Sequence, residues 1–289
     1  RTTVSIDPRS VVTGQISATN AVPGEDVITH LSAPIQAASE KALADAIAGA
    51  RSRGWRADSG AAVVMDVTNG AVVAAASYPS YRPEVWTGGI SEANLLALTD
   101  ARAGTPLVSR LTSSVFSPAS TFKVISLPAA VKAGNSLSGT YNCGASFRVG
   151  NRNIHNYEST AHGVINLHTA LVISCDTIFY QFAYRSWLSQ GGLAAKTDAG
   201  DPFVAMAKGF GLGGRTGIDL PEETAGRIPD RAWKQQNWDG TKVDTCARAR
   251  TGYPDVAGTD PARAVYLKAL AVENCQTGFQ FRAGDAANF

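Results

Sequence analysis

Ser120 and Lys123 form a Ser-x-x-Lys pair whose residue types and spacing suit nucleophilic chemistry. Residues 118–133 predict a helix that Gly134 ends, so Ser120 lies near the helix start and Lys123 lies one turn later on the same face. A serine hydroxyl is a weak nucleophile until a base takes its proton. Lysine acts as a base only when neutral, and burial at a helix start favours the neutral form. The alternative is a serine that caps the helix and a solvent-exposed lysine.

Ser174, Cys175 and Asp176 form a second polar group, 51 residues after Lys123. They interrupt residues 166–189, which otherwise predict two helical stretches. The Ser174 hydroxyl can relay a proton to a leaving group, and a polar side chain at Asp176 can hold a substrate amide. The alternative is that Asp176 only caps the helix that follows it.

Cys143 and Cys175 lie within 33 residues of sequence that also hold His155 and His162. Two cysteines and two histidines can bind zinc tetrahedrally, although these spacings match no compact zinc finger. A Cys143–Cys175 disulfide is the second interpretation, and it requires an oxidising compartment. Two buried thiols and two loop histidines are the third. Because Cys175 is adjacent to Ser174, under each interpretation we expect its side chain to point away from the pocket.

The elements that must position these groups are predicted from hydrophobic patterning. Ser32 begins a helical pattern that Gly54 ends. Two apolar runs joined by a Thr-Asn-Gly turn predict a β-hairpin, and because both runs are almost wholly apolar, we expect helices to cover both of its faces. A further helix begins near Ser91. The two hairpin strands are residues 60–66 and 71–77, and further short strands and turns lie in residues 135–165.

Residues 230–289 show only weak patterning and predict a loop-rich insertion. Cys246 and Cys275 flank the insertion, and we expect a disulfide between them. Such a bridge closes a loop of about 30 residues and contributes roughly 3 kcal/mol to stability.

Composition sets the class of protein. The chain has 289 residues, of which 17% are charged and 44% hydrophobic, and its formal net charge is +2. These values describe one large or two small folded domains and exclude a disordered chain. The near-zero net charge and the lack of basic runs argue against nucleic acid as a partner. No stretch approaches 18 consecutive apolar residues, so the sequence predicts no membrane span.

Four segments taken together resemble a known family. They are the hairpin GAAVVMDVTNGAVVAAASYPSYRP, the Ser120 segment GTPLVSRLTSSVFSPASTFKV, the Ser174 segment HGVINLHTALVISCDTIFYQFA and the glycine-rich segment FGLGGRTGIDLPEE. In this order they resemble the transpeptidase domain of class B penicillin-binding proteins, whose signature combines Ser-x-x-Lys, a second serine motif and Lys-Thr-Gly. The resemblance covers most of residues 27–289. Asp176, where Asn is usual, is similar to the elongation-type, penicillin-binding protein 2-like branch.

The resemblance implies an α/β fold in which helices flank an antiparallel sheet beside an all-helical subdomain, as in the serine β-lactamases. It implies that Ser120 is the acylated nucleophile, Lys123 its base, and Ser174 the group that transfers a proton to the leaving amine. Asp176 would contact the substrate, but an ionised Asp only accepts hydrogen bonds, which puts the amide contact of the usual Asn in doubt. The resemblance implies no cofactor and no metal.

The implied activity is that of a peptidoglycan D,D-transpeptidase, which cross-links stem peptides through a serine acyl-enzyme and is acylated by β-lactams. The implied setting is the extracytoplasmic face of the cell membrane, with a membrane glycan polymerase of the SEDS type as partner and a membrane anchor outside this chain. Two alternatives stay open. One is a penicillin-recognising hydrolase, either a D,D-carboxypeptidase or a β-lactamase, which deacylates quickly. The other is a non-catalytic cell-wall scaffold, which forms no adduct.

The family's third motif is a Lys-Thr-Gly or related triplet on an inner strand, where it helps to form the oxyanion hole. This chain has no Lys-Thr-Gly, and Arg250-Thr251-Gly252 lies in a stretch without a strand pattern. We therefore expect residues 27–289 to be a transpeptidase domain that lacks its C-terminal strands. We expect residues 1–26 to be the tail of an upstream pedestal domain or linker. On this expectation the natural protein continues beyond Phe289 into strands that carry Lys-Thr-Gly or Lys-Ser-Gly, and residues 1–289 alone are poorly folded and nearly inactive.

Overall fold

The computed structural model describes most of the chain, which forms two compact units over residues 1–111 and 112–289. All four strand pairs among the described residues are antiparallel, and each sheet there has two strands. Within the same residues, no helix combines the length with the apolar composition that a bilayer crossing demands. The described residues are 2–20, 22, 24–55, 57–149, 152–195, 197–253 and 261–277.

The described residues of the first unit form two β-hairpins and two α-helices. Its elements are β1 (Thr2–Ile6), β2 (Val12–Ala18), α1 (Ala33–Ser52), β3 (Gly60–Met65), β4 (Val72–Tyr78), the 3₁₀ helix η1 (Pro83–Trp86) and α2 (Glu92–Thr99). The predictions of a helix after Ser32, a hairpin over β3 and β4, and a helix near Ser91 are confirmed. Ser91 caps α2, since its side chain accepts a hydrogen bond from the backbone N–H of Asn94 at 3.2 Å.

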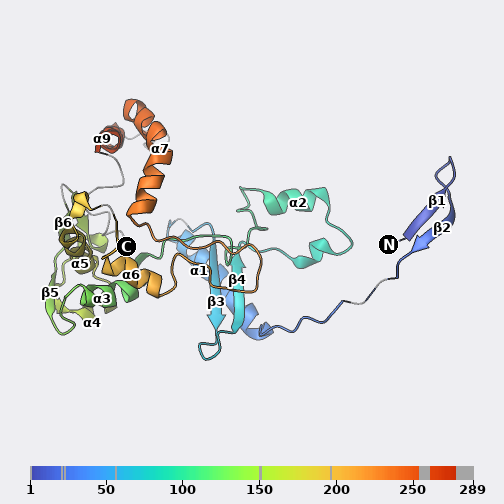
Figure 1. The fold of residues 1–289 in the computed structure, drawn as a ribbon, viewed down its shortest axis with the longest axis horizontal. Coiled ribbons are helices and arrows are strands. Elements are labelled where there is room, and N and C mark those ends of the chain that lie inside the picture. Colours follow the sequence, from blue (N-terminus) through green and yellow to red (C-terminus); the bar gives the residue numbers. More distant parts are fainter. Residues whose placement is uncertain are drawn as a thin grey trace. The chain divides into compact units, whose positions relative to one another are not determined.

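Helix α1 packs on the β3–β4 hairpin (Figure 1). Ala76 of β4 is buried, and the Gln36 side chain exchanges two hydrogen bonds, of 2.8 and 2.9 Å, with the backbone of Ala75. Gln36 thereby satisfies both backbone groups of Ala75, as one residue of a neighbouring strand would. Strand β3 differs, because Val63 is 48% and Met65 52% exposed. The expectation that helices cover both faces is therefore wrong for β3 in the described part of the chain.

The second unit holds the elements that carry Ser120, Lys123 and Ser174. Strand β5 pairs with β8 and β6 pairs with β7, and a break at residues 173–175 separates α4 from α5, as predicted. The elements are η2 (Ala119–Phe122), α3 (Lys123–Lys132), β5 (Thr140–Cys143), β6 (Ser146–Val149), β7 (Arg152–His155), η3 (Tyr157–Ser159), β8 (Gly163–Asn166), α4 (Leu167–Val172), α5 (Asp176–Ser189), η4 (Gly192–Ala194), α6 (Pro202–Gly209), α7 (Arg231–Thr251) and α9 (Pro261–Thr277).

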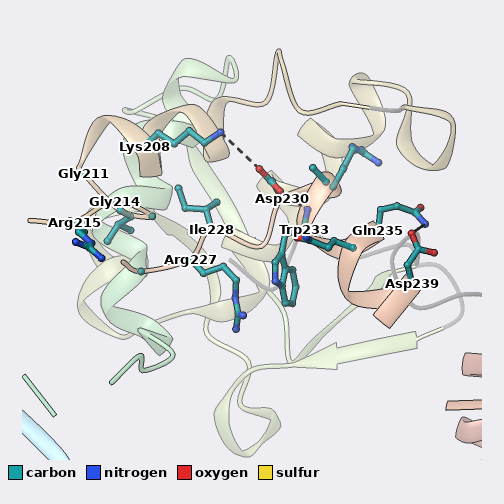
Figure 2. Close-up of a pocket in the computed structure, with 16 residues that line it drawn as sticks. Lys208, Gly211, Gly214, Arg215, Arg227, Ile228, Asp230, Trp233, Gln235 and Asp239 are labelled. Atoms are coloured by element: carbon teal, nitrogen blue, oxygen red, sulfur yellow. Dashed lines mark hydrogen bonds and ion pairs between the residues drawn. The ribbon is translucent and has the colours of Figure 1, made fainter. Parts of the chain in front are cut away.

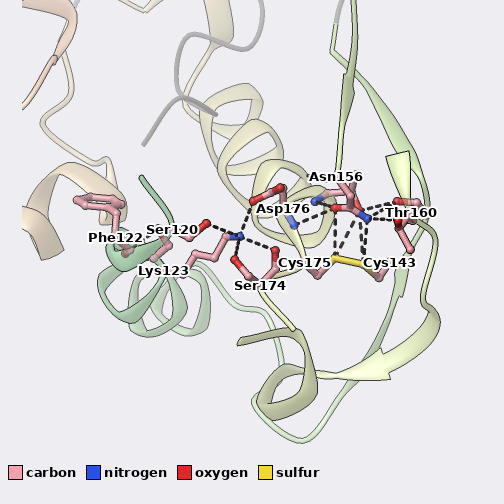
Figure 3. Close-up of polar contacts among 12 residues, drawn as sticks. Ser120, Phe122, Lys123, Cys143, Asn156, Thr160, Ser174, Cys175 and Asp176 are labelled. Carbon is pink, nitrogen blue, oxygen red and sulfur yellow. Dashed lines mark hydrogen bonds and ion pairs between the residues drawn. A yellow bond between two sulfur atoms is a disulfide. The ribbon is translucent and has the colours of Figure 1, made fainter. Parts of the chain in front are cut away.

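Helix α3 takes part in both hydrophobic clusters of the second unit. Phe122, the last residue of η2, and Ile125, in the first turn of α3, pack with residues of α6 in one cluster. Ala129 and Ala130, further along, pack with residues of α4 and α5 in the other. These contacts fix the rotation of α3 about its axis, so Lys123 points to a different side from Phe122 (Figure 3).

The segment after residue 230 is helical where the structure describes it. Helices α7 and α9 pack against each other, and a disulfide joins Cys246 to Cys275. The expectation of a loop-rich insertion is therefore wrong for these two helices. The triplet from Arg250 to Gly252 ends α7 and supplies its C-cap, so it does not lie on a strand. The rest of the insertion, residues 254–260 and 278–289, lies outside the described residues.

Candidate active site

Ser120 lies on the 3₁₀ helix η2, directly before α3 (Figure 3). The turn starts at Pro118, and Ala119 has a φ of 49°, in the left-handed region that glycine adopts more readily. Ser120 itself is exposed, whereas its neighbours Phe122 and Lys123 are buried. A substrate can therefore reach the Ser120 hydroxyl from solvent while the base beside it stays enclosed by protein.

The Lys123 side chain is only 9% exposed, and four oxygen atoms surround its Nζ. Nζ lies 3.2 Å from Ser120 Oγ, 2.9 Å from Ser174 Oγ and 2.8 Å from the Ser174 carbonyl oxygen. It also forms an ion pair with Asp176 Oδ1. The structure therefore gathers the four candidate residues that the sequence singled out around one amine (Figure 3).

Ser174 presents two oxygens to Lys123 because of its backbone conformation. It occupies the joint between α4 and α5, and its φ of 58° is left-handed. Its hydroxyl and its carbonyl oxygen both contact Lys123 Nζ. The next side chain, Cys175, is buried and bonded to Cys143, away from Lys123 (Figure 3). Ser174 therefore contacts the active-site lysine, while the adjacent Cys175 points to the other side of the joint and forms the disulfide.

Asp176 is the first residue of α5, and its side chain is 21% exposed. The positive end of a helix stabilises a carboxylate at this position. Burial and, second, the negative charge of Asp176 raise the pKa of Tyr180, one turn later, so its phenol is neutral at physiological pH. The aromatic ring of Phe179 also lies beside Lys123, with its centroid 5.7 Å from Nζ.

This arrangement can move a proton between two hydroxyls. An ammonium group has three N–H donors, and Lys123 faces four acceptor oxygens. In its neutral form the same amine can take the proton of Ser120 and pass one to Ser174. Asp176 balances the charge of Lys123 whenever the amine carries the additional proton.

The structure joins Cys143 to Cys175 in a disulfide. The two sulfurs bond to each other, so they are not available as thiolate ligands, and the zinc interpretation loses half of its ligand set. His155 instead contacts the Ser159 hydroxyl through Nδ1 at 3.3 Å. Among the described residues no group of three or more His, Cys, Asp or Glu side chains could hold a metal ion.

Sequence reasoning missed Asn156, whose side chain contacts the backbone of Asp176 from a loop 20 residues earlier. An asparagine that follows a short strand carries no signal of this role. The only hint in the sequence is the possible pairing of Cys143 with Cys175, which would bring that loop to the Ser174 joint.

A separate open pocket of about 1340 Å³ also lies in the second unit (Figure 2). The glycine-rich loop from Gly211 to Gly214 and the first turns of α7 line it. The Arg227 guanidinium lies over the Trp233 ring there, 4.5 Å from its centroid. The lining includes neither Ser120 nor Lys123, so this pocket is not part of the candidate active site.

Comparison with known proteins places the chain in a family. The family model described as penicillin binding protein transpeptidase domain matches residues 60–247. Peptidoglycan D,D-transpeptidase MrdA of Escherichia coli K12 is 33% identical over 238 residues, which are 81% of this chain and 34% of MrdA. The chain therefore spans about a third of the length of the curated relatives it matches.

Several solved structures have a similar fold. A chain of a peptidoglycan synthase complex that coordinates polymerization and crosslinking has a TM-score of 0.62 and 26% identity, over 99% of this chain and 44% of that one. The imipenem acyl-enzyme of penicillin-binding protein A from M. tuberculosis has a TM-score of 0.53 and 26% identity, over 70% of this chain and 44% of that one. With a family model that covers more than half of its residues, the chain belongs to the penicillin-binding protein transpeptidase domain family.

Proposed function

We propose that this chain is the catalytic part of a peptidoglycan D,D-transpeptidase, with Ser120 as nucleophile, Lys123 as base and Ser174 as proton relay. The observation that carries the proposal is the position of Lys123 Nζ, within hydrogen-bond distance of both serine hydroxyls. Two relatives support it by their own chemistry. MrdA is named a peptidoglycan D,D-transpeptidase, and penicillin-binding protein A of M. tuberculosis forms an acyl-enzyme with imipenem.

In the proposed acylation, Ser120 Oγ attacks the carbonyl carbon of the D-Ala-D-Ala peptide bond while its proton passes to the neutral Lys123 amine. The C–N bond then breaks, and the proton reaches the departing D-Ala nitrogen by way of the Ser174 hydroxyl. This leaves Ser120 esterified and Lys123 neutral again. An acceptor amine from a neighbouring stem peptide attacks the ester, and its proton returns to Ser120 Oγ by the reverse route.

In this scheme the main role of Asp176 is to pair with Lys123. Its carboxylate balances the charge that forms on the amine during each proton transfer. Contact with a substrate amide, which the family resemblance implies, would use its second oxygen and only as an acceptor. An asparagine at the same place would offer a donor as well.

The proposed substrates are peptidoglycan stem peptides, and β-lactams would acylate Ser120 in their place. The two disulfides suit an oxidising compartment, which supports the extracytoplasmic face of the membrane as the place of action. A SEDS-type membrane glycan polymerase is the proposed partner, because a structurally similar chain comes from a peptidoglycan synthase complex. In the proposed division, residues 27–289 are the transpeptidase domain and residues 1–26 lead into it.

The test, made on the natural full-length protein, is turnover of a donor peptide that ends in D-Ala-D-Ala, in the presence of an amine acceptor. Mass spectrometry should find a product that joins the donor acyl group to the acceptor, with one D-Ala released for each product. Hydrolysis without transfer would identify a carboxypeptidase instead. If neither product forms, or if Ser120→Ala forms both at the original rate, the proposal is wrong.

A further inference from the structure

Two of the three residues whose oxygen atoms contact Lys123 Nζ, Ser174 and Asp176, lie where α4 gives way to α5. Helix α4 ends at Val172 and α5 begins at Asp176, and Ser174 between them has a φ of 58°. A residue other than glycine keeps this conformation only where its surroundings impose it. The contacts that fix this joint therefore also fix the geometry around Lys123.

Asn156 supplies one such contact from the loop after β7 (Figure 3). Its Oδ1 accepts hydrogen bonds from the backbone N–H groups of Asp176 at 2.9 Å and Thr177 at 3.0 Å. These N–H groups are among the first donors of α5, which have no partner within the helix. Cys175, at the N-cap position, provides no side-chain acceptor. Asn156 therefore caps α5 in its place.

The amide of Asn156 uses its full hydrogen-bonding capacity. Its Nδ2 donates to the carbonyl oxygens of Gly144 at 2.9 Å and Thr160 at 2.8 Å, and the residue is 6% exposed. An asparagine amide offers two acceptor positions on its oxygen and two N–H donors, and the contacts of Asn156 use all four. Aspartate would keep the two acceptor sites and lose both donors. Alanine would lose all four and leave buried backbone groups unsatisfied.

The Cys143–Cys175 disulfide ties the same joint to the same loop. Cys143 ends β5 directly before Gly144, and Cys175 follows Ser174 in the joint. Both cysteines are at most 1% exposed. Thr177 adds a hydrogen bond from its Oγ1 to the Gly144 carbonyl oxygen at 2.9 Å. The disulfide and the hydrogen bonds of Asn156 and Thr177 therefore all connect the joint to the strand-and-loop region that holds Gly144 and Asn156.

We propose that Asn156 and the Cys143–Cys175 disulfide are positioning groups, which hold Ser174 and Asp176 on Lys123. They act through the backbone of the joint and not on the amine itself. The inference rests on the proposed function, in which Lys123 moves protons between Ser120 and Ser174. A displacement of about 1 Å in such a site can cost about 100-fold in rate, so these groups are required for the rate and not for stability alone.

The test compares Asn156→Ala and Cys143→Ala/Cys175→Ala with a matched control that removes the other disulfide, Cys246→Ala/Cys275→Ala. Each variant, made in the natural full-length protein, reacts with a fluorescent penicillin, and two quantities are measured, the fraction labelled at saturation and the acylation rate constant. A purely structural role lowers the labelled fraction and leaves the rate constant of the folded molecules unchanged. Positioning lowers the rate constant by about tenfold or more at an unchanged fraction, while the control stays within about twofold.

Asn156→Asp keeps the test informative if the alanine variant does not fold. It retains the two acceptors that cap α5 and loses the donors to the loop. We expect it to fold and to acylate at a rate between those of the original chain and Asn156→Ala. Rate constants in Asn156→Asp and in the Cys143/Cys175 variant that equal the control's would overturn the proposal.

A second readout does not depend on the proposed function. If the unsubstituted full-length protein takes up no penicillin, the proposed function has failed, and the positioning is read from the reactivity of Lys123. Acetic anhydride acetylates exposed amines, and peptide mass spectrometry compares Lys123 with the exposed Lys132 of the same helix. Faster acetylation of Lys123 in the joint variants, with the control unchanged, supports the positioning role. Equal rates in all chains overturn it.

Discussion

Two residues beside Lys123 hold left-handed backbone, Ala119 with a φ of 49° and Ser174 with a φ of 58°. In this region the Cβ atom crowds a carbonyl oxygen, at a cost of roughly 1–2 kcal/mol for residues other than glycine. Ala119 directs the turn that carries Ser120, and Ser174 directs two oxygens to Lys123 Nζ. Strain is therefore stored at both points where the site places a hydroxyl.

Ala119→Gly should raise the stability of the chain. Glycine relieves the left-handed strain, and its larger loss of backbone entropy on folding limits the gain to about 1 kcal/mol. Urea denaturation measures the difference as a higher midpoint at an unchanged m-value. A lower midpoint for Ala119→Gly would contradict the conformation assigned to this turn.

Lys123→Arg should remove acylation by penicillin while it keeps a cation beside Asp176. The guanidinium stays protonated in proteins and cannot take the proton of Ser120. Loss of a general base costs about 10²–10⁴ in rate, which a stopped-flow assay with a chromogenic β-lactam resolves. Lys132→Arg, at an exposed position of the same helix, is the matched control and should react normally. A normal rate for Lys123→Arg would show that Lys123 is not the base.

The Ser120–Lys123 pair and the Ser174 joint could be found in the sequence because local spacing defines each of them. A serine and a lysine three residues apart on a helix share one face whatever surrounds them. Asn156 could not be found in this way, since its role depends on a contact with the start of a helix 20 residues later. The catalytic roles of Ser120, Lys123, Ser174 and Asp176 stay predictions until acylation is measured.

Helix α7 could not be predicted from the sequence of its own residues. Its composition is polar, and Gly240 lies in its interior, so no apolar stripe of helical period marks it. Packing with α9 and the Cys246–Cys275 disulfide support the helix instead. The β3–β4 hairpin was predictable from its two apolar runs and their turn, but an apolar run alone does not reveal how many of its faces are covered.

The α7–α9 pair should depend on its disulfide. The bridge joins residues 29 apart, and its removal in Cys246→Ala/Cys275→Ala should cost about 3–4 kcal/mol of local stability. Hydrogen exchange should show loss of amide protection in α9, and peptide mapping of the original chain without reductant should recover the linked pair. Unchanged protection in the variant would show that helix packing alone holds α9.

The loop from Thr216 to Glu223 should lose order on acidification. Glu223 accepts hydrogen bonds from the Thr216 hydroxyl at 2.6 Å, the Thr216 N–H at 2.7 Å and the Gly217 N–H at 3.3 Å. The Thr216 hydroxyl, and then these backbone bonds, lower the pKa of Glu223 below its ordinary value of 4.5. A lowered pKa means that the carboxylate stabilises the loop above pH 4.5, and that this stability disappears as the pH falls through the lowered value.

NMR signals of the Thr216 and Gly217 amides report this transition. We expect Glu223→Ala to show at pH 7 the shifts that the original chain shows only in acid. Glu222→Ala removes the neighbouring carboxylate and serves as the control. Acid-independent signals in the original chain, or equal effects of the two substitutions, would contradict the role of Glu223.

At the scale of the whole molecule, the order of several motifs identified the family where no single motif could. Ser-x-x-Lys alone recurs by chance, but four segments in the family's order do not, and the family model over residues 60–247 confirms the prediction. The α/β class with antiparallel strands and flanking helices was predictable for the same reason. The division after Leu111 was not, because no change in composition marks it. The predicted boundary at residue 26 stays a prediction.

The penicillin adduct is the measurement that tests the central claim most directly, namely that Ser120, activated by Lys123, is the residue that becomes acylated. The natural full-length protein is incubated with a penicillin, and intact mass spectrometry followed by peptide mapping locates the adduct. Opening of the β-lactam ring expels no leaving group, so we predict a mass increase equal to the whole penicillin, on the peptide that contains Ser120, and no increase in Ser120→Ala. An adduct on a different residue, or equal labelling of Ser120→Ala, would contradict the account.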